Sequence, residues 1–257
     1  MKRFQLFEFT DLSFWPDVFR TLLTDHLHTF LEMTKPFNLK AGAIAEALRR
    51  GKTSQIVDIC SGGSGPWLHL KQQVEKELGG KVSVLLTDKF PNQKTAVRIE
   101  ELEGLDYCLE SVDALAVPET FNGIRTIVDG LHHFPPELAR KILADAVQKG
   151  RPIIVLEGLQ RTWREFLQTA LLPLFVLLLA PFVKPFKLSR LFFTYVVPVA
   201  PFVIGWDGAV SVLRCYTPEE LLEMGRGAGG SFEWDAGTYR HKGAPVTWLV
   251  GLPKAAG

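Results

Sequence analysis

The sequence has few cysteines, and they lie far apart. Its 257 residues include only Cys60, Cys108 and Cys215, and no two of them form a C-x-x-C pair. Closely spaced cysteine pairs are typical of disulfide-rich secreted domains and of structural zinc sites. The sequence therefore argues against both classes and favours the reducing environment of the cytoplasm.

The chain also lacks an excess of charge of either sign. Its 29 lysines and arginines are nearly balanced by 28 acidic residues. Because nucleic acids are bound mainly through an excess of positive charge, we expect no nucleic-acid partner. With 47% apolar residues and no bias toward its 22 glycines or 16 prolines, the chain is neither disordered nor fibrous. One large domain is expected.

An export signal and an uninterrupted membrane span are missing as well. The basic start is followed by Glu8 and Asp11 before any apolar run develops, which argues against a signal peptide. A membrane-spanning helix needs about 20 apolar residues. The longest uncharged run, 166–183, has 18 residues and is interrupted by prolines. We therefore expect a cytoplasmic chain.

Short apolar runs alternate with amphipathic stretches over the central part of the chain. Runs of this kind, bounded by Gly, Pro or acidic residues, are typical of strands buried on both faces. Their alternation with helices predicts an α/β fold with a parallel sheet and right-handed crossovers. The predicted strands are 55–60, 82–87, 106–109, 124–128 and 152–156, and the predicted helices between them are 68–78, 91–103 and 135–149.

The N-terminal part is predicted to be helical. Apolar residues recur at helical spacing over 12–34 and again over 38–50. We expect these helices to form a cap, 1–51, in front of a ligand-binding domain, 52–257.

The C-terminal part carries a helix signal and a hairpin signal. Thr217, followed by Pro218 and Glu220, predicts a helix that opens with a capping box. The runs 231–235 and 246–251 predict an antiparallel hairpin at the edge of the sheet.

Four of the predicted strands carry an acid or a glycine-rich loop at the carboxyl end. These residues are Asp58 with the glycine-rich stretch that ends at Gly65, then Asp88, Asp129 and Glu157. In open parallel sheets, ligands bind outside the carboxyl ends of the strands. The sequence therefore predicts a site at this edge.

The glycine-rich stretch and two acids suggest a nucleoside-containing ligand. Gly62, Gly63 and Gly65 allow close approach of the backbone, and the next helix offers unpaired N–H groups. A carboxylate at Asp88 can accept hydrogen bonds from both hydroxyls of a ribose. Asp113 can accept from an exocyclic amine. Each signal alone also fits a tight turn, a solvated carboxylate or a helix cap.

In this order, the motifs resemble those of the class I S-adenosylmethionine (SAM)-dependent methyltransferases. The resemblance covers residues 52–160. It implies a three-layer, Rossmann-like fold with a mostly parallel seven-stranded sheet and an antiparallel last strand, and SAM as the cofactor. The motifs are Val57–Gly65, Asp88, Asp113–Ala114 and Ile127–Phe134.

The resemblance also implies roles for individual residues. The family pattern Asp-x-Gly-x-Gly-x-Gly is here Asp58-x-Cys60-x-Gly62-x-Ser64, so its first and third glycines are replaced. By similarity, Asp58, Cys60, Ser61, Gly62, Gly63 and Gly65 hold the methionine part, Asp88 the ribose, Asp113 and Ala114 the adenine, and Asp129 and Gly130 line the pocket near the sulfonium.

A proton acceptor is needed if the methyl acceptor carries a proton. His132 and His133 follow the fourth predicted strand, and a neutral imidazole suits this role at pH 7. Adjacent residues cannot both face the site, and Glu157 is a second candidate. His26 and His28 do not share a helix face, and no carboxylate cluster marks a magnesium site, so we predict no metal.

The apolar segment 166–206 interrupts the second half of the chain. Its only charged residues are Lys184, Lys187 and Arg190. We expect an insertion, at about 160–210, with three interpretations: a lid over the acceptor, a peripheral membrane contact, or a homodimer interface.

The sequence thus predicts a SAM-dependent methyltransferase that acts on a small or lipid-like hydrophobic acceptor. Two alternatives stay open. One is an NAD(P)-dependent oxidoreductase, although the chain lacks the Gly-x-Gly-x-x-Gly spacing and a Tyr-x-x-x-Lys pair. The other is a SAM-binding, membrane-peripheral protein without catalytic turnover.

Overall fold

The computed structural model describes residues 1–12 and 14–254. The chain divides into two compact units, each assembled from two separate stretches of sequence. The sheet unit comprises Lys35–Gly158 and Thr217–Gly257, and the helical unit comprises Met1–Thr34 and Leu159–Tyr216.

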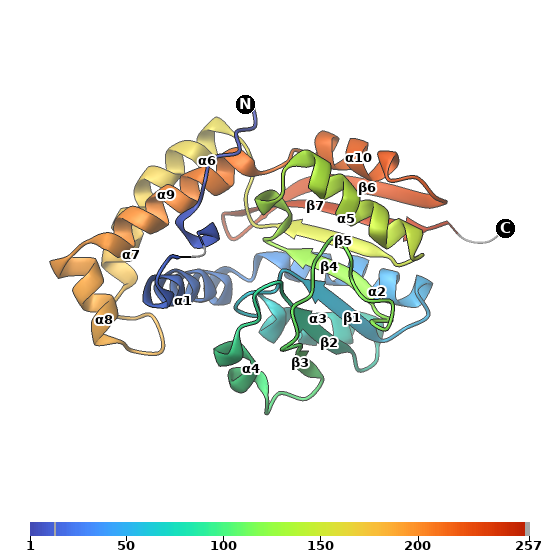
Figure 1. The fold of residues 1–257 in the computed structure, drawn as a ribbon, viewed down its shortest axis with the longest axis horizontal. Coiled ribbons are helices and arrows are strands. Elements are labelled where there is room, and N and C mark those ends of the chain that lie inside the picture. The colour runs from blue at the N-terminus through green and yellow to red at the C-terminus, as the bar shows by residue number, and fades with distance from the viewer. Residues whose placement is uncertain (13, 255–257) are drawn as a thin grey trace. The chain divides into compact units, whose positions relative to one another are not determined.

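The sheet unit contains a seven-stranded sheet in the order β3-β2-β1-β4-β5-β7-β6 (Figure 1). The first five strands of the chain are parallel, and β7 is antiparallel to both β5 and β6. The predicted fold class, including the antiparallel last strand, is confirmed. The strands are β1 (Gln55–Ile59), β2 (Ser83–Thr87), β3 (Leu105–Tyr107), β4 (Ile124–Val128), β5 (Ile153–Glu157), β6 (Phe232–His241) and β7 (Ala244–Pro253).

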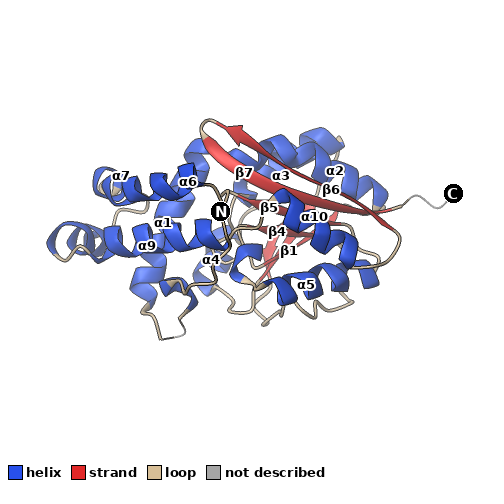
Figure 2. Ribbon diagram, turned by 90° about the horizontal axis from the view of Figure 1, so that it is seen from above, coloured by secondary structure: helices blue, strands red, loops and turns tan. Residues whose placement is uncertain are grey.

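Helices cover both faces of this sheet, with α2 and α3 on one face and α5 and α10 on the other (Figure 2). Every residue of β4 and β5 is buried, as the continuous apolar runs predict for strands between two helical layers. The helices of this unit are η2 (Pro36–Lys40), α2 (Ala41–Arg50), α3 (Trp67–Leu78), α4 (Gln93–Ile99), η3 (Leu131–His133), α5 (Pro136–Gln148) and α10 (Pro218–Gly227), where η marks short 3₁₀ segments.

The C-terminal elements agree with the sequence in type, and the hairpin is longer than expected. The capping box is present, because the Thr217 side chain accepts from the N–H of Glu220 and the Glu220 side chain accepts from that of Thr217. β6 and β7 pair over ten residues each, so both strands extend beyond the predicted runs 231–235 and 246–251. Gly237, which lies outside both predicted runs, is part of β6, where a Cβ would come within 2.9 Å of the Trp248 ring.

The predicted boundary at residue 51 also differs from the compact units. Helix α2 belongs to the sheet unit, because its buried side chains Ile44, Ala45 and Leu48 face an interior that includes α3 and β7. The predicted helix at 12–34 instead joins the apolar insertion in the helical unit.

The helical unit is built around α1, α7 and α9. Leu22, Val176 and Ala200 form a buried cluster between these helices. The elements of this unit are η1 (Phe9–Asp11), α1 (Asp17–Thr34), α6 (Trp163–Gln168), η4 (Thr169–Leu171), α7 (Leu172–Leu179), α8 (Leu188–Leu191), the π-helical turn η5 (Phe192–Val196) and α9 (Val199–Arg214).

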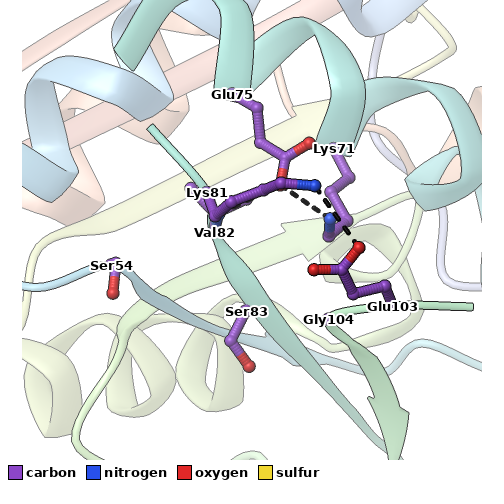
Figure 3. A pocket seen from close by; sticks show the side chains of 8 residues that line it. All are labelled: Ser54, Lys71, Glu75, Lys81, Val82, Ser83, Glu103 and Gly104. Atoms are coloured by element: carbon purple, nitrogen blue, oxygen red, sulfur yellow. Dashed lines mark hydrogen bonds and ion pairs between the residues drawn. The ribbon is translucent and has the colours of Figure 1, made fainter. Parts of the chain in front are cut away.

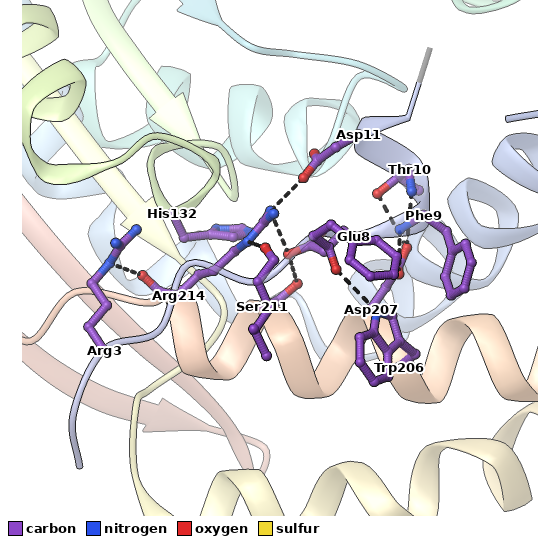
Figure 4. Close-up of polar contacts among 12 residues, drawn as sticks. Arg3, Glu8, Phe9, Thr10, Asp11, His132, Trp206, Asp207, Ser211 and Arg214 are labelled. Atoms are coloured by element: carbon purple, nitrogen blue, oxygen red, sulfur yellow. Dashed lines mark hydrogen bonds and ion pairs between the residues drawn. The ribbon is translucent and has the colours of Figure 1, made fainter. Parts of the chain in front are cut away.

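Polar contacts tie the N-terminal stretch to α9 (Figure 4). The carboxylate of Asp207 accepts from the backbone N–H groups of Phe9 at 2.8 Å and Thr10 at 3.3 Å. Arg214 pairs with Glu8 at 3.2 Å and Asp11 at 2.7 Å. Burial, together with the neighbouring Glu8, raises the pKa of Asp207 to about 6. Residues nearly 200 positions apart thus form one small core.

Candidate active site at the carboxyl edge of the sheet

The loops after β1, β2 and β3 meet at one edge of the sheet. In the parallel register, Ile59 at the end of β1 lies beside Thr87 at the end of β2. The N–H of Ser61 donates to the carbonyl of Thr87 at 3.0 Å, and that of Gly62 donates to the Asp88 carboxylate at 2.9 Å. The N–H of Val112 donates to the carbonyl of Asp88 at 3.0 Å. These bonds bring together the three loops that carry the first predicted site residues.

The loops after β4 and β5 join the same edge. The N–H of Asp129 donates to Leu156, and the Asp129 carboxylate accepts from the N–H of Gly158. Gly130 lies against the β1 loop, where an added Cβ would come within 3.0 Å of the Cys60 Cβ. The structure therefore gathers all the sequence-predicted site residues around the carboxyl ends of five parallel strands.

The β1 loop keeps a left-handed path although it lacks two of the expected glycines. The backbone φ is 63° at Cys60, 48° at Gly62, 77° at Ser64 and 51° at Gly65. For a residue with a side chain, this conformation costs about 1–2 kcal/mol. An added Cβ at Gly62 or Gly65 would meet nothing within 4 Å, so the backbone there borders open space.

Side chains from two neighbouring elements hold this strained loop. The Tyr107 hydroxyl on β3 donates to the carbonyl of Gly62 at 3.1 Å. One terminal nitrogen of Arg98 on α4 donates to the carbonyl of Gly63 at 2.6 Å and to the Ser64 hydroxyl at 2.7 Å. Hydrogen bonds from a charged donor stabilise by about 1.5–3 kcal/mol. Arg98 therefore offsets the conformational cost of a serine in place of glycine.

This compensation predicts that Arg98 and Ser64 are energetically coupled. Arg98→Ala should speed hydrogen exchange of the amides at 60–66 and lower the melting temperature by several degrees. The same change in a Ser64→Gly background should have a smaller effect, because the strain and one acceptor are gone. Equal effects of Arg98→Ala in both backgrounds, measured as a double-mutant cycle, would contradict the coupling.

Asp58 and Ser61 stabilise the β1 loop through buried hydrogen bonds. Asp58 is 2% exposed, and its two carboxylate oxygens accept from the hydroxyls of Ser61 at 2.7 Å and Thr126 at 2.6 Å. Burial raises the pKa of Asp58 to about 7, although both hydrogen bonds act in the opposite direction. Both carboxylate oxygens of Asp58 already accept hydrogen bonds from the protein, so a direct contact of Asp58 with a ligand stays a prediction.

Asp88 and Asp113 lie nearer the solvent. One oxygen of Asp88 accepts from Gly62 and the other from the N–H of Phe90 at 2.8 Å. Asp113 pairs with Lys89 at 2.9 Å and accepts from the N–H of Leu115, and these two contacts lower its pKa. Ala114, next to it, is buried. Each carboxylate oxygen can accept a further bond, so both acids retain capacity for a ligand.

His132 forms a buried pair with Glu157. The Glu157 carboxylate accepts from the backbone N–H of His132 at 3.1 Å and contacts the ring Nδ1 at 2.6 Å. His132 is 4% exposed and Glu157 is 1% exposed. An ionised carboxylate only accepts hydrogen bonds, so a neutral ring that donates to Glu157 through Nδ1 carries its lone pair on Nε2. This tautomer is the one that a proton acceptor at Nε2 needs.

His133 and Asp129 complete the β4 loop. The His133 ring lies 4.3 Å from that of His132, centroid to centroid, and is partly exposed. Asp129 has a φ of 52°, which aspartate tolerates better than most residues. Burial and the nearby Glu157 raise the pKa of Asp129 to about 7.

Cys60 lies among several carboxylates of the site. Burial, followed by the nearby carboxylates of Asp88 and Asp58, raises the pKa of its thiol well above the usual range. Glu157 and Asp113 act in the same direction. Burial disfavours a charge of either sign, whereas the four carboxylates would favour a cation placed beside them.

The opposite edge of the sheet contains a separate hollow of about 240 Å³ (Figure 3). Ser54 and Ser83 place it at the amino ends of β1 and β2. The charged side chains that line it include Lys71 paired with Glu75 and Lys81 paired with Glu103. None of the predicted site residues lines this hollow.

Comparison with solved structures identifies the fold. The mitomycin 7-O-methyltransferase MmcR matches with a TM-score of 0.54 and 14% identity, over 96% of this chain and 61% of its own. The O-methyltransferase NcsB1 from neocarzinostatin biosynthesis, solved with SAM and 2-hydroxy-5-methyl naphthoic acid, matches with a TM-score of 0.51 and 13% identity, over 95% and 62%. This chain has the class I methyltransferase fold.

The match is one of architecture. No protein-family model and no curated protein sequence matches the chain. The chain spans about three-fifths of the length of the two methyltransferases it resembles. Within the methyltransferase fold, the predicted site residues occupy the carboxyl edge of the sheet, and the glycine-loop departures at Cys60 and Ser64 leave the left-handed path intact.

Sequence reasoning missed the residues that shape this edge from outside the motifs. Tyr107, Arg98 and Lys89 all contact the loops or acids of the site. The serine at position 64, in place of the family's third glycine, is the one signal in the sequence that could have suggested a compensating partner. That partner, Arg98, lies 34 residues further along the chain, and no periodicity or motif marks it.

Proposed function

We propose that this chain binds SAM at the carboxyl edge of the sheet and transfers its methyl group to a hydroxyl of a hydrophobic acceptor. The buried pair of His132 and Glu157, located at the same edge as the β1 loop and Asp88, carries the proposal.

The residues present fit a positively charged nucleoside cofactor. Carboxylates surround the Cys60 position and favour a cation such as a sulfonium or an α-ammonium group. Gly62 and Gly65 leave open space beside the loop backbone. Asp88 would take the ribose hydroxyls, and Asp113 with Ala114 would meet the adenine edge.

Bound SAM supplies a methyl group that its sulfonium already activates for an in-line displacement. The protein then has to align the acceptor, exclude water and remove one proton. His132 accepts that proton at Nε2, and Glu157 stabilises the resulting imidazolium through Nδ1. Glu157 is thus a positioning residue, and His133 is the alternative base.

The acceptor is proposed to be small or lipid-like and apolar. The two solved structures described above both carry the name O-methyltransferase, and one was solved with 2-hydroxy-5-methyl naphthoic acid. A hydroxyl acceptor is also the kind that needs a base such as His132.

A ligand-binding comparison tests the proposal against its alternatives. S-adenosylhomocysteine should raise the melting temperature, since a ligand at about 100 times its Kd stabilises by about 2.7 kcal/mol. NADH should not, and a shift with NADH alone would favour an oxidoreductase. Transfer of a labelled methyl group to an apolar extract should follow. S-adenosylhomocysteine binding without any transfer would favour the non-catalytic alternative.

A further inference from the structure

The helical unit exposes an unusually apolar helix. All eight residues of α7 are apolar, and Val176 on its inner side packs with Leu22 and Ala200. A second apolar stripe faces outward, at positions i, i+3, i+4, i+7 and i+11, which lie on one side of a helix. It consists of Leu171, Leu174, Phe175, Leu178 and, just beyond α7, Phe182, with exposures of 50–75%.

The turn between α7 and α8 continues this surface. Phe182, Phe186 and Leu188 are 75%, 63% and 75% exposed. Contiguous exposed apolar surfaces of this kind mark sites of contact with proteins or membranes. We call the side chains of Phe175, Leu178, Phe182, Phe186 and Leu188 the apolar tip.

Four backbone groups of this turn have hydrogen-bond partners inside the protein. The N–H groups of Phe182 and Val183 donate to the carbonyl of Leu179. The guanidinium of Arg190, which is fully buried, donates to the carbonyls of Val183 and Pro185. Backbone groups that enter lipid must be paired in this way, because no water is there to replace the protein partner.

The charges beneath the turn are also compensated. The carboxylate of Asp25 on α1 accepts from Lys187 at 2.7 Å and Arg190 at 2.5 Å. Lys184 stays exposed beside the apolar tip. Because 166–206 contains no acid and Asp25 already pairs with Lys187 and Arg190, the exposed charge that this segment adds to the apolar tip is the positive charge of Lys184.

We infer that the apolar tip inserts into the interfacial layer of an anionic lipid bilayer. A cation beside exposed aromatic and aliphatic side chains complements anionic headgroups. If two copies met through this face, the cations of one copy would face those of the other, and 166–206 contains no acid that could pair with them. No single helix among residues 1–12 and 14–254 is long and apolar enough to cross a membrane, and the helix pair Leu188–Val196 and Val199–Arg214 that passes by length and composition is bent by 82°.

Vesicle binding by the full chain tests this inference, and it needs no cofactor. The protein should sediment with phosphatidylcholine vesicles that contain phosphatidylserine. A triple variant, Phe182→Ser, Phe186→Ser and Leu188→Ser, should bind at least about 100-fold more weakly, since each buried side chain of this size contributes tenfold or more. Lys184→Gln should lower binding by about fivefold, and only to the anionic vesicles.

A matched control separates the tip from general surface hydrophobicity. Val97 on α4 is 72% exposed, so Val97→Ser should leave vesicle binding unchanged. Tryptophan placed by Phe182→Trp should be quenched by lipids brominated in the acyl chain, relative to wild type. All substituted side chains are exposed, so circular dichroism should confirm that the variants fold.

Three results would overturn the inference. Wild-type protein could fail to bind either kind of vesicle, or the triple variant could bind as tightly as wild type. Alternatively, light scattering could show a concentration-dependent dimer of the wild-type protein that the triple variant does not form, while the wild type does not bind vesicles. That result would assign the apolar tip to contact with a second copy of this chain.

Discussion

Replacing His132 with alanine is expected to lower kcat by about 10²–10⁴-fold and to leave the Kd for S-adenosylhomocysteine nearly unchanged. The reason is the separation of tasks within the site. In the proposal, His132 contacts Glu157 through Nδ1 and accepts the proton at Nε2, whereas the β1 loop and Asp88, proposed to bind the cofactor, follow other strands. Single-turnover methyl transfer and isothermal titration measure the two quantities independently.

Glu157→Gln and His133→Ala test which residue is the proton acceptor and which residue positions it. Glu157→Gln keeps the shape of the side chain and removes the charge that stabilises the imidazolium, so kcat should fall by a smaller factor, about 10–100-fold. In wild type, kcat should fall at low pH, where the base is protonated. The residual activity of His132→Ala should show no such fall. If His132→Ala keeps full turnover while His133→Ala abolishes it, the proton acceptor has been assigned to the wrong ring.

Replacing Asp88 with alanine is expected to weaken S-adenosylhomocysteine binding by roughly 100-fold or more, because two hydrogen bonds from ribose hydroxyls to a charged acceptor are worth about 3 kcal/mol or more. The same change frees the N–H groups of Gly62 and Phe90, which loosens the loop. The thermal shift with the ligand should therefore disappear at concentrations that saturate wild type.

Asp106 supplies the matched control for this experiment. It is an exposed carboxylate on the neighbouring strand β3 and is not at a strand tip. Asp106→Ala should bind the ligand like wild type, and Asp88→Asn should lie between wild type and Asp88→Ala. A full thermal shift in Asp88→Ala would remove this residue from the cofactor site and would require another acceptor for the ribose.

The fold could be predicted because its signals are local and repeated. Four of the parallel strands are short, largely apolar runs with an acid at or next to the carboxyl end, and β4 lies where the sequence places it. Parallel strands bring their carboxyl ends to one edge, so the gathering of Asp58, Asp88 and Asp113 follows from topology alone. The capping box at Thr217 is equally local.

Features that depend on distant residues could not be predicted. The single unit formed by residues 1–34 and 159–216 rests on contacts such as that of Asp207 with the N–H of Phe9, which no spacing rule indicates. The pairing of His132 with Glu157 required the register of two strands. The inclusion of Gly237 in β6 depends on the Trp248 ring of the next strand, which occupies the place of a side chain and leaves no local signal.

The contacts of Asp207 with the N-terminal stretch have a consequence for synthesis of the protein. Phe9 leaves the ribosome 198 residues before its partner. At about 5–20 residues per second, the interval is on the order of 10–40 s. Throughout that time Phe7 and Phe9 lack their ring contacts with Trp206 and Phe202, so the N-terminal stretch cannot take its folded position before α9 has been synthesised.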